Sequence, residues 1–336
     1  MNTLVPPVAP GWPERLRGAR VLLFAPHPDD ESLGGGGFIQ HALQAGARLD
    51  IVSLTDGDTN PWPQRVLERC LRIGAVDRQR WGERRHAEMR AALSCLGAGD
   101  ARLHRLGWPD MGVTAYLQTD SRAAIEALRR LWRDVAPDVV VVPSLTDAHP
   151  DHSACHVLVR LVMSLENGCD ACLTYHVHGR RPHDGQPVAF RLDEPMRAAK
   201  YRAIEAHRTQ VALARRRLLA HAGSREVLHE LHVAADRSSL ARGGELALPW
   251  QPPRGLWPWL ELTLAHRAGV HHWRWTRAPL AWREGRVWIA LPDGAADGPV
   301  FAKLKLRCRS PWIFDHWGWH DLTAAPAPHQ AFPLQY

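Results

Sequence analysis

The chain has 336 residues, of which 45% are apolar and 23% are charged, and its formal net charge is +7. This composition is typical of a globular protein with one large domain or two ordinary ones, which excludes an intrinsically disordered or a fibrous chain. No run approaches the ~20 consecutive apolar residues of a membrane-spanning helix, so we expect no such helix.

Up to about residue 219, short β-rich runs alternate with helical stretches. Apolar runs predict strands at 20–25, 49–54, 101–106, 138–142 and 171–177. Helical spacing of apolar residues predicts helices at 38–45, 83–96, 121–135, 154–165 and 194–219, the last as one long helix or a pair. Apolar strands separated by helices are typical of a parallel sheet covered on both faces. We therefore expect a Rossmann-like, three-layer α/β sandwich over residues 1–222.

The pattern changes near residue 223. Ten of the fifteen tryptophans lie from Trp250 to Trp319, in short segments that proline and glycine interrupt. Alternating side chains predict strands at 287–291 and 301–307. We expect residues 223–336 to form a smaller, Trp-rich and β-rich appendage that packs on the first region. Its tryptophans serve either as core and interface or as a substrate-binding surface.

An acidic segment, FAPHPDDESLGGGG at 24–37, follows the first predicted strand. In an open α/β sheet, ligands bind at the carboxyl ends of the strands. Crowded carboxylates are unfavourable there unless a cation lies among them. His27 and Asp30 are three residues apart and can both turn toward one metal ion. Without a metal, the segment would be a rigid acidic loop that caps the next helix.

A second cluster, DAHPDH at 147–152, follows the predicted strand at 138–142. Together the two clusters would make a site of two histidines and one carboxylate with an open position, which is the ligand set of catalytic zinc. Alone, the second cluster could be a proline turn before a helix. The glycine run lacks the G-x-G-x-x-G pattern of a dinucleotide loop, and the C-x-x-C of Cys169 and Cys172 has no partner pair.

These two motifs resemble those of the PIG-L/LmbE family of zinc-dependent de-N-acetylases, whose signature reads (A/P)HPDDE and then HPDH. The resemblance spans about residues 19–215, and weaker matches along the chain agree with it. The weaker matches are Thr55-Asp56-Gly57, Arg85-x-x-Glu88, Leu106-Gly107-Trp108-Pro109-Asp110 and the late-helix residues Lys200, His207 and Gln210.

The resemblance implies a metal-dependent amide hydrolase whose zinc ion, or another divalent ion, is held by His27, Asp30 and His152. Zinc lowers the pKa of a bound water to about 7 and polarises an amide carbonyl. The expected reaction is hydrolysis of an N-acetyl group, which releases acetate and a free amine.

The resemblance also implies roles for five further residues. Asp29 would be the general base, and His149 would be the acid or the partner of the oxyanion, oriented by Asp151. Arg85 and Asp110 are candidates for binding sugar hydroxyls.

Members of the family act on an N-acetylglucosamine-type sugar carried on a larger aglycone. Indole rings stack on sugars and arginine pairs with phosphate, so the basic, Trp-rich appendage favours a glycoconjugate or glycolipid of surface-polysaccharide or lipopolysaccharide type. A second hypothesis is a zinc amidase for another amide, such as a sugar-linked thiol conjugate. A third is a non-enzymic, basic binding protein with a degenerate site.

The first residues and the cysteines of the chain bear on where in the cell the protein acts. The first residues hold proline and charge where a signal peptide needs an apolar segment, and the six scattered cysteines do not form a disulfide framework. We expect a cytoplasmic protein with peripheral contact at the inner face of the membrane. Because the first region has no basic run interleaved with aromatic residues, we expect no nucleic-acid partner.

Overall fold

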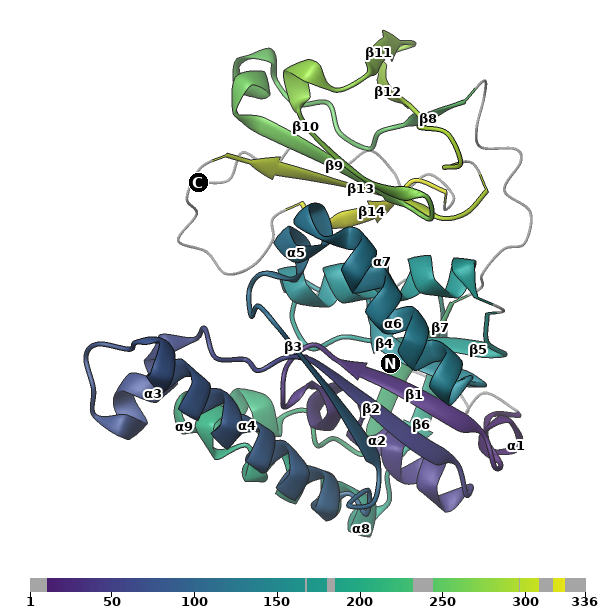
Figure 1. Ribbon diagram of the computed structural model, residues 1–336. Helices are drawn as coiled ribbons and strands as arrows, with labels where there is room; N and C mark the ends of the chain where they lie inside the picture. The colour runs from purple at the N-terminus through teal and green to yellow at the C-terminus, as the bar shows by residue number, and fades with distance from the viewer. Residues whose placement is uncertain are drawn as a thin grey trace, which may run out of the picture.

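The computed structural model describes residues 11–166, 168–179, 185–231, 244–295, 297–307 and 317–323. An α/β region with a central sheet occupies the lower half of Figure 1, and a β-rich region lies above it. The α/β sandwich with a mostly parallel sheet and a β-rich C-terminal region is thereby confirmed. Among the described residues, no helix combines the length and the apolar character needed to cross a membrane.

Seven strands form the central sheet, in the order β3-β2-β1-β4-β5-β7-β6. The strands are β1 (Arg20–Ala25), β2 (Arg48–Thr55), β3 (Arg102–Trp108), β4 (Val139–Pro143), β5 (Ala171–Tyr175), β6 (Gln186–Arg191) and β7 (Arg225–Glu230). The first five pair in parallel, whereas β7 runs antiparallel to both β5 and β6. The strand order reverses between β1 and β4, and such a switch point is where open α/β sheets bind their ligands.

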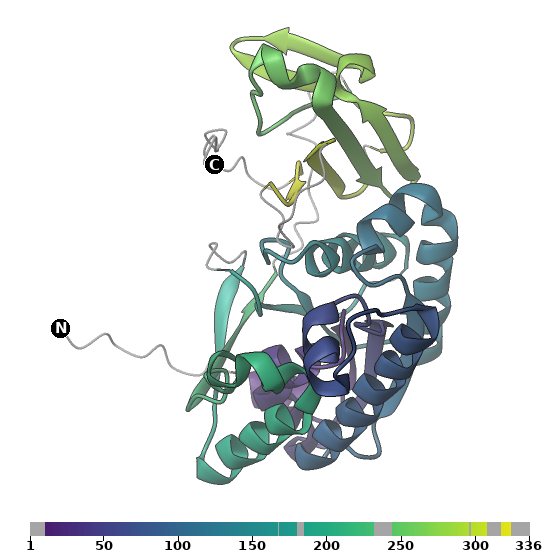
Figure 2. The same ribbon diagram turned by 90° about the vertical axis from the view of Figure 1, so that its left-hand side faces the viewer.

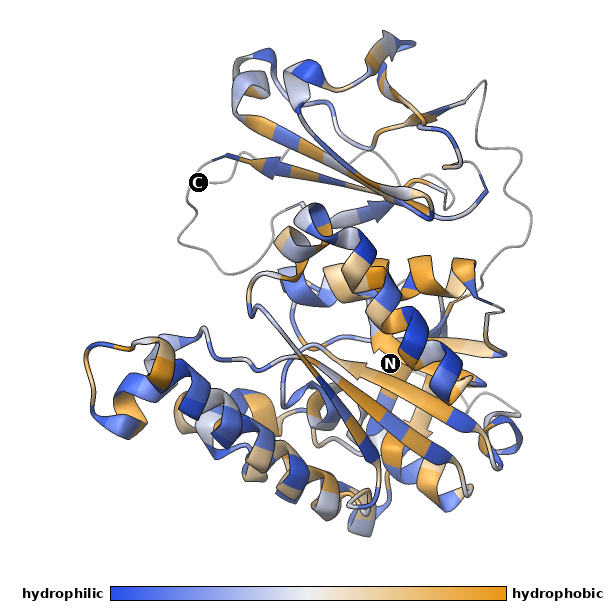
Figure 3. Cartoon of the chain, in the orientation of Figure 1, coloured by the Kyte–Doolittle hydropathy of each residue, from blue (hydrophilic) through white to orange (hydrophobic). Residues whose placement is uncertain are grey.

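Helices cover both faces of the sheet. They are α1 (Trp12–Leu16), α2 (Asp30–Gln44), α3 (Pro61–Glu68), α4 (Ala75–Cys95), α5 (Val113–Thr119), α6 (Ser121–Val135), α7 (Pro150–Leu165), α8 (Glu194–Ala206) and α9 (Arg208–Leu219). Alternate strand residues point to opposite faces, so Leu23 and Ile51 pack with α2, α4 and α8, and Leu22 and Val52 pack with α6 and α7. Figure 3 shows the hydrophobic character of the buried strands β1 and β2.

Helix α2 begins at Asp30, well before the start at residue 38 that the sequence predicts. The glycine run, which precedes the expected helix, lies inside α2, because other elements approach it too closely for side chains. A Cβ atom at Gly34 would overlap the ring of Tyr175, and one at Gly37 would lie 2.8 Å from Leu192 Cδ1. The glycines therefore let β5 and its neighbours pack directly on the helix that carries Asp30.

A buried ion pair is inserted between two turns of α2. Lys200 donates to the carbonyl of Leu33 at 3.1 Å, and Glu226 accepts from the N–H groups of Gly37 and Phe38 at 2.9 and 2.7 Å. Lys200 and Glu226 also pair with each other. Backbone groups in the middle of α2 are thus satisfied by side chains from α8 and β7, which fixes the helix against both elements.

The β-rich region consists of two small sheets, in the orders β10-β9-β13-β14 and β11-β12-β8. Its strands are β8 (Glu245–Ala247), β9 (Leu260–His266), β10 (Gly269–Arg274), β11 (Leu280–Arg283), β12 (Arg286–Ala290), β13 (Val300–Leu306) and β14 (Trp319–Asp321). Figure 2 shows this region lying over the α5–α7 side of the α/β region, where Gln118 Nε2 donates to Thr263 Oγ1 at 2.7 Å. Since β7 belongs to the central sheet, we now propose that the two regions divide after Glu230, beyond the expected boundary at residue 222.

Candidate active site

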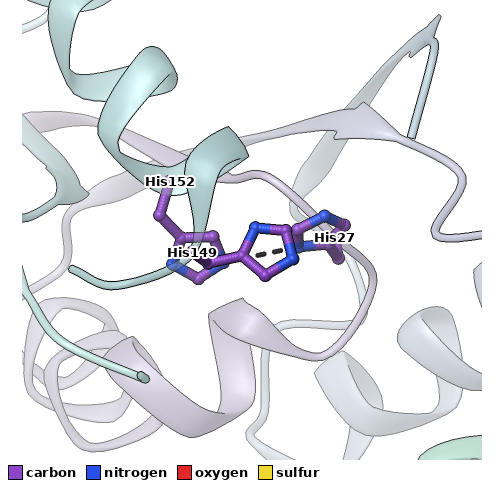
Figure 4. A group of neighbouring side chains, drawn as sticks. All are labelled: His27, His149 and His152. Atoms are coloured by element: carbon purple, nitrogen blue, oxygen red, sulfur yellow. Dashed lines mark hydrogen bonds between the residues drawn. The ribbon is translucent and has the colours of Figure 1, made fainter. Parts of the chain in front are cut away.

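The two histidine–aspartate motifs meet at the switch point of the sheet. His27 lies in the turn after β1, and Asp30 is the first residue of α2. After β4, His149 caps α7 and His152 lies in its first turn. Figure 4 shows the rings of His27, His149 and His152 gathered together, although the motifs are more than a hundred residues apart in the chain.

Three donor atoms of this site are spaced as metal ligands. His27 Nδ1 and Asp30 Oδ2 lie 3.2 Å apart, His152 Nε2 and Asp30 Oδ2 lie 3.0 Å apart, and the two nitrogens lie 3.3 Å apart. A tetrahedral zinc ion with bonds of about 2.0–2.1 Å separates its ligand atoms by about 3.3 Å. The three side chains are buried, and their donor set fits such an ion with adjustments of a few tenths of an ångström.

Two further residues join this group. Nitrogens of His27, His149 and His152 lie within 4.8 Å of one another, and the same holds for ligand atoms of Asp30, His152 and His178. His178, which follows β5, lies outside both sequence motifs and was not predicted. Its position after a parallel strand, at the edge where both motifs lie, is the signal that could have identified it.

The electrostatics of the site favour a cation. Burial lowers the pKa of His152, but Asp30 and Asp147 outweigh it and raise this pKa to about 10. For His27, burial again lowers the pKa and hydrogen bonds to three aspartates raise it well above its usual value. These aspartates are Asp110, Asp151 and Asp30. A bound metal ion would supply the positive charge that the two imidazoles otherwise provide as protons.

Asp147 connects the loops that hold the histidines. Its carboxylate accepts from the N–H groups of His149 at 2.9 Å, Val177 at 2.9 Å and His178 at 3.0 Å, and it lies 3.2 Å from His152 Nδ1. By facing Nδ1, it leaves Nε2 of His152 directed at Asp30. Asp147 belongs to the second sequence motif, but no role could be predicted for it, because its partners Val177 and His178 come from the loop after β5.

Asp29 has an unusual backbone conformation, with a φ angle of 146°. Non-glycine residues adopt such angles at a cost of about 1–3 kcal/mol, and here Glu31 holds the turn by accepting from the Asp29 N–H at 3.0 Å. The Asp29 carboxylate lies 3.3 Å from Arg85. Burial raises the pKa of Asp29 to about 6, with Arg85 acting against this shift and Asp30 adding to it. Such a pKa suits a group that both accepts and donates protons near neutral pH.

The orientation of His149 comes from the backbone and differs from the expected arrangement. Its Nδ1 accepts from the Asp151 N–H at 3.2 Å, so the neutral ring carries its hydrogen on Nε2. The Asp151 carboxylate instead accepts from the N–H groups of Met111 at 2.7 Å and Val113 at 3.1 Å. The side chain of Asp151 therefore holds the loop after β3 rather than the ring of His149. Burial, followed by the charges of neighbouring histidines, lowers the pKa of His149 well below its usual value.

The two candidates for sugar binding lie in the site but are engaged with its loops. Arg85 donates to the carbonyls of Gly57 at 2.6 Å and Pro28 at 2.7 Å. Asp110 accepts from the Thr59 N–H at 2.7 Å, and its other oxygen lies 3.2 Å from His27 Nε2. Both side chains position neighbouring site residues, and contact with sugar hydroxyls stays a prediction.

The family model described as "PIG-L: GlcNAc-PI de-N-acetylase" matches residues 22–163. A curated relative from Mycolicibacterium paratuberculosis, 1D-myo-inositol 2-acetamido-2-deoxy-alpha-D-glucopyranoside deacetylase, is 36% identical over 150 residues. A Mycobacterium tuberculosis protein of the same name is 32% identical over 146 residues. Both alignments cover 40% of this chain and 47% of the relative, so the chain spans about half the length of the curated relatives it matches.

Solved structures share the fold of about two thirds of this chain. Teicoplanin deacetylase Orf2, in its zinc-inhibited form, aligns with a TM-score of 0.52 at 15% identity, covering 65% of this chain and 99% of that one. N,N'-diacetylchitobiose deacetylase from Pyrococcus horikoshii aligns with a TM-score of 0.50 at 19% identity, covering 66% and 89% of the two chains. At these identities the likeness establishes the fold. The family match, which includes both histidine–aspartate motifs, shows that residues 22–163 are similar to the PIG-L family domain.

Proposed function

We propose that this protein is a zinc-dependent amide hydrolase that removes the acetyl group from an N-acetylated amino sugar of the N-acetylglucosamine type. The observation that carries the proposal is the placement of three potential ligand atoms within 3.3 Å of one another, with the Asp29 carboxylate on the adjoining residue. The curated relatives, named as deacetylases of an inositol-linked acetamido sugar, support this class of substrate.

In the proposed site, His27, Asp30 and His152 hold the ion, and Asp147 fixes the ring of His152 through Nδ1. When bound, the ion supplies Lewis acidity toward the acetyl carbonyl and the attacking water. Among other divalent ions, those that accept imidazole and carboxylate ligands together would also suit this donor set.

Asp29 is the proposed proton carrier. Its carboxylate takes one proton from the attacking water as the oxygen adds to the acetyl carbonyl carbon. The carbon–nitrogen bond then breaks, and Asp29 returns the proton to the departing amine, so acetate and a free amine leave. The ion pair with Arg85 keeps the carboxylate from turning away from the reacting atoms.

His149 is the proposed partner of the carbonyl oxygen. Because its Nδ1 is occupied by the Asp151 N–H, its Nε2–H is available as a donor. A fixed N–H group that points at the negative charge developing on the carbonyl oxygen stabilises the transition state, and the ring need not be a charged imidazolium to do so. This step uses the neutral ring that the lowered pKa of His149 favours.

The test is acetate release from an inositol-linked N-acetylglucosamine and from N,N'-diacetylchitobiose by zinc-loaded protein. We expect Asp29→Asn to retain zinc and to lose about 10²–10⁴-fold in kcat, the usual contribution of a general acid–base group. Asp134→Asn is a matched control, since this carboxylate pairs with Arg102 on the surface. Full turnover by Asp29→Asn would refute the proposed role, and the absence of release by the unaltered protein would refute the activity.

We further propose that the sugar is carried on a glycoconjugate or glycolipid of surface-polysaccharide or lipopolysaccharide type. The exposed indoles of Trp259 and Trp282 in the β-rich region support this. The partly buried Trp257 stacks on Trp282 with ring centroids 5.3 Å apart. If so, Trp282→Ala raises KM for a glycoconjugate and leaves KM for the free disaccharide unchanged. Equal effects on both substrates would contradict this role.

A further inference from the structure

A projecting segment beside the site exposes an unusual amount of apolar surface. We call residues 61–76, which comprise α3 and the chain that leads into α4, the α3 protrusion (Figure 1). Of the ten large apolar side chains exposed in the described parts of the chain, five belong to it. They are Trp62 (63% exposed), Val66 (55%), Leu67 (39%), Leu71 (87%) and Val76 (74%). Concentrated apolar exposure of this kind marks an interaction surface.

The orientation of α3 is the reverse of that expected for a helix covering a core. The side chain of Gln64 is fully buried, and its Nε2 donates to Glu68 Oε2 at 3.0 Å and to the Asp77 carbonyl at 2.8 Å. Trp62 and Val66, by contrast, face outward. A helix of a water-exposed surface normally turns its apolar side inward. Here polar contacts anchor the inner side on the protein, and the apolar side is left for a partner.

Cationic side chains lie among the exposed apolar ones. Arg69, Arg72 and Arg78 are exposed along the same stretch, and the Arg65 guanidinium lies 5.1 Å from the centroid of the Trp62 ring. The acidic residues of the stretch, Glu68 and Asp77, both pair with Arg80, at 2.6 and 3.0 Å. The outward surface therefore combines tryptophan, aliphatic and arginine side chains, which is the combination that inserts into the interface of an anionic bilayer.

The α3 protrusion is directly linked to the active-site edge. It begins two residues after Thr59, whose N–H donates to Asp110 Oδ2 at 2.7 Å. The other oxygen of Asp110 lies 3.2 Å from His27 Nε2. A surface that receives the protrusion would therefore lie close to the loops that hold Asp110 and His27.

We propose that the α3 protrusion docks this protein on the surface of an anionic lipid bilayer and thereby brings the active site to acetamido sugars borne on lipids. The docking itself stands on the exposed side chains and their charge. The delivery of a lipid-borne substrate rests on the proposed function.

The experiment is co-flotation of the full chain with vesicles of phosphatidylcholine alone or with one quarter of phosphatidylglycerol. We expect binding to the anionic vesicles that weakens at high salt. The variants Trp62→Ser and Leu71→Ser, and the double variant Arg69→Glu/Arg72→Glu, should each weaken it by about tenfold or more. Leu213→Ser is the matched control, because Leu213 of α9 is 53% exposed and lies outside the α3 protrusion, and it should bind as the unaltered protein does.

Several results would overturn the proposal. Equal binding to both kinds of vesicle, no binding to either, or unchanged binding by the protrusion variants would each contradict it. A dimer in solution that Leu71→Ser converts to a monomer would assign the surface to a second copy of the chain instead.

Activity measurements separate this proposal from the proposed function. The protrusion variants should release acetate from a free disaccharide at the normal rate and lose turnover only on a vesicle-borne acetamido sugar. Anionic-vesicle binding by a protein that deacetylates no sugar would uphold docking and refute the proposed function. Deacetylation of vesicle-borne sugar that is unaffected by Leu71→Ser would refute delivery by the protrusion.

Discussion

The sharpest prediction concerns Asp147, which does not itself lie among the three proposed ligands. Its two oxygens serve three backbone N–H groups, of His149, Val177 and His178, and also lie against His152 Nδ1 at 3.2 Å. In Asp147→Asn the side chain keeps its shape but loses its charge, and its NH₂ group can accept none of these hydrogen bonds. The ring of His152 should be held less firmly in its orientation, and its Nε2 should become less basic.

Loss of such an outer partner of a metal ligand typically costs 10–100-fold in metal affinity, or about 1.4–2.7 kcal/mol. The assay is competition for zinc between the protein and a chromophoric chelator at neutral pH. Asp138→Asn is the control, because Asp138 precedes β4 as Asp147 follows it, and its carboxylate holds Arg20 at the far end of the strand. Unchanged zinc affinity in Asp147→Asn, or an equal loss in Asp138→Asn, would refute this reasoning.

Two other predictions concern stability. Gly34→Ala places a Cβ on the Tyr175 ring, so thermal unfolding should show a loss of about 1–3 kcal/mol despite the higher helix propensity of alanine, and a stabilised variant would contradict the packing. Burial, helped by Arg160, lowers the pKa of His156 to about 3, so below pH 6.5 the unfolded chain binds this proton and the folded chain does not. Stability from this group is complete above pH 6.5 and falls as the pH drops toward 3, by about 2 kcal/mol between pH 6.5 and 5. Denaturant titrations at pH 6.5 and at pH 5 give the free energy of unfolding at each pH. Its decrease between the two should be smaller in His156→Gln than in the unaltered protein by about 2 kcal/mol. An equal decrease in both proteins would disprove the buried neutral histidine.

Local patterns were sufficient to predict the five parallel strands of the sheet and the two motifs. The run Val139–Pro143 is apolar and β-branched, so it could be assigned to a buried strand, and the residues after it had to lie at the ligand-binding edge. Position after a strand identified His27 in the same way. The closeness of the two motifs thus followed from the topology of a parallel sheet.

The features that sequence analysis missed depend on distant contacts. Glycine has a low helix propensity, so the sequence predicts no helix over residues 34–37, and only the approach of Tyr175 explains their place in α2. Helix α3 was not predicted, because it exposes Val66 and buries Gln64, the reverse of the usual pattern. Strand β7 joins the central sheet through pairing with β5 and β6, which no local signal indicates.

A crystal structure of the zinc-loaded protein, with the ion located by anomalous scattering at the zinc edge, would test the proposed metal site. We expect one ion at the carboxyl ends of β1 and β4, bound by His27, Asp30 and His152, with Asp29 beside an open coordination position. An ion bound instead by His27, Asp110 and Asp151, which also lie close enough to hold one, or an absence of zinc from this edge of the sheet, would contradict it.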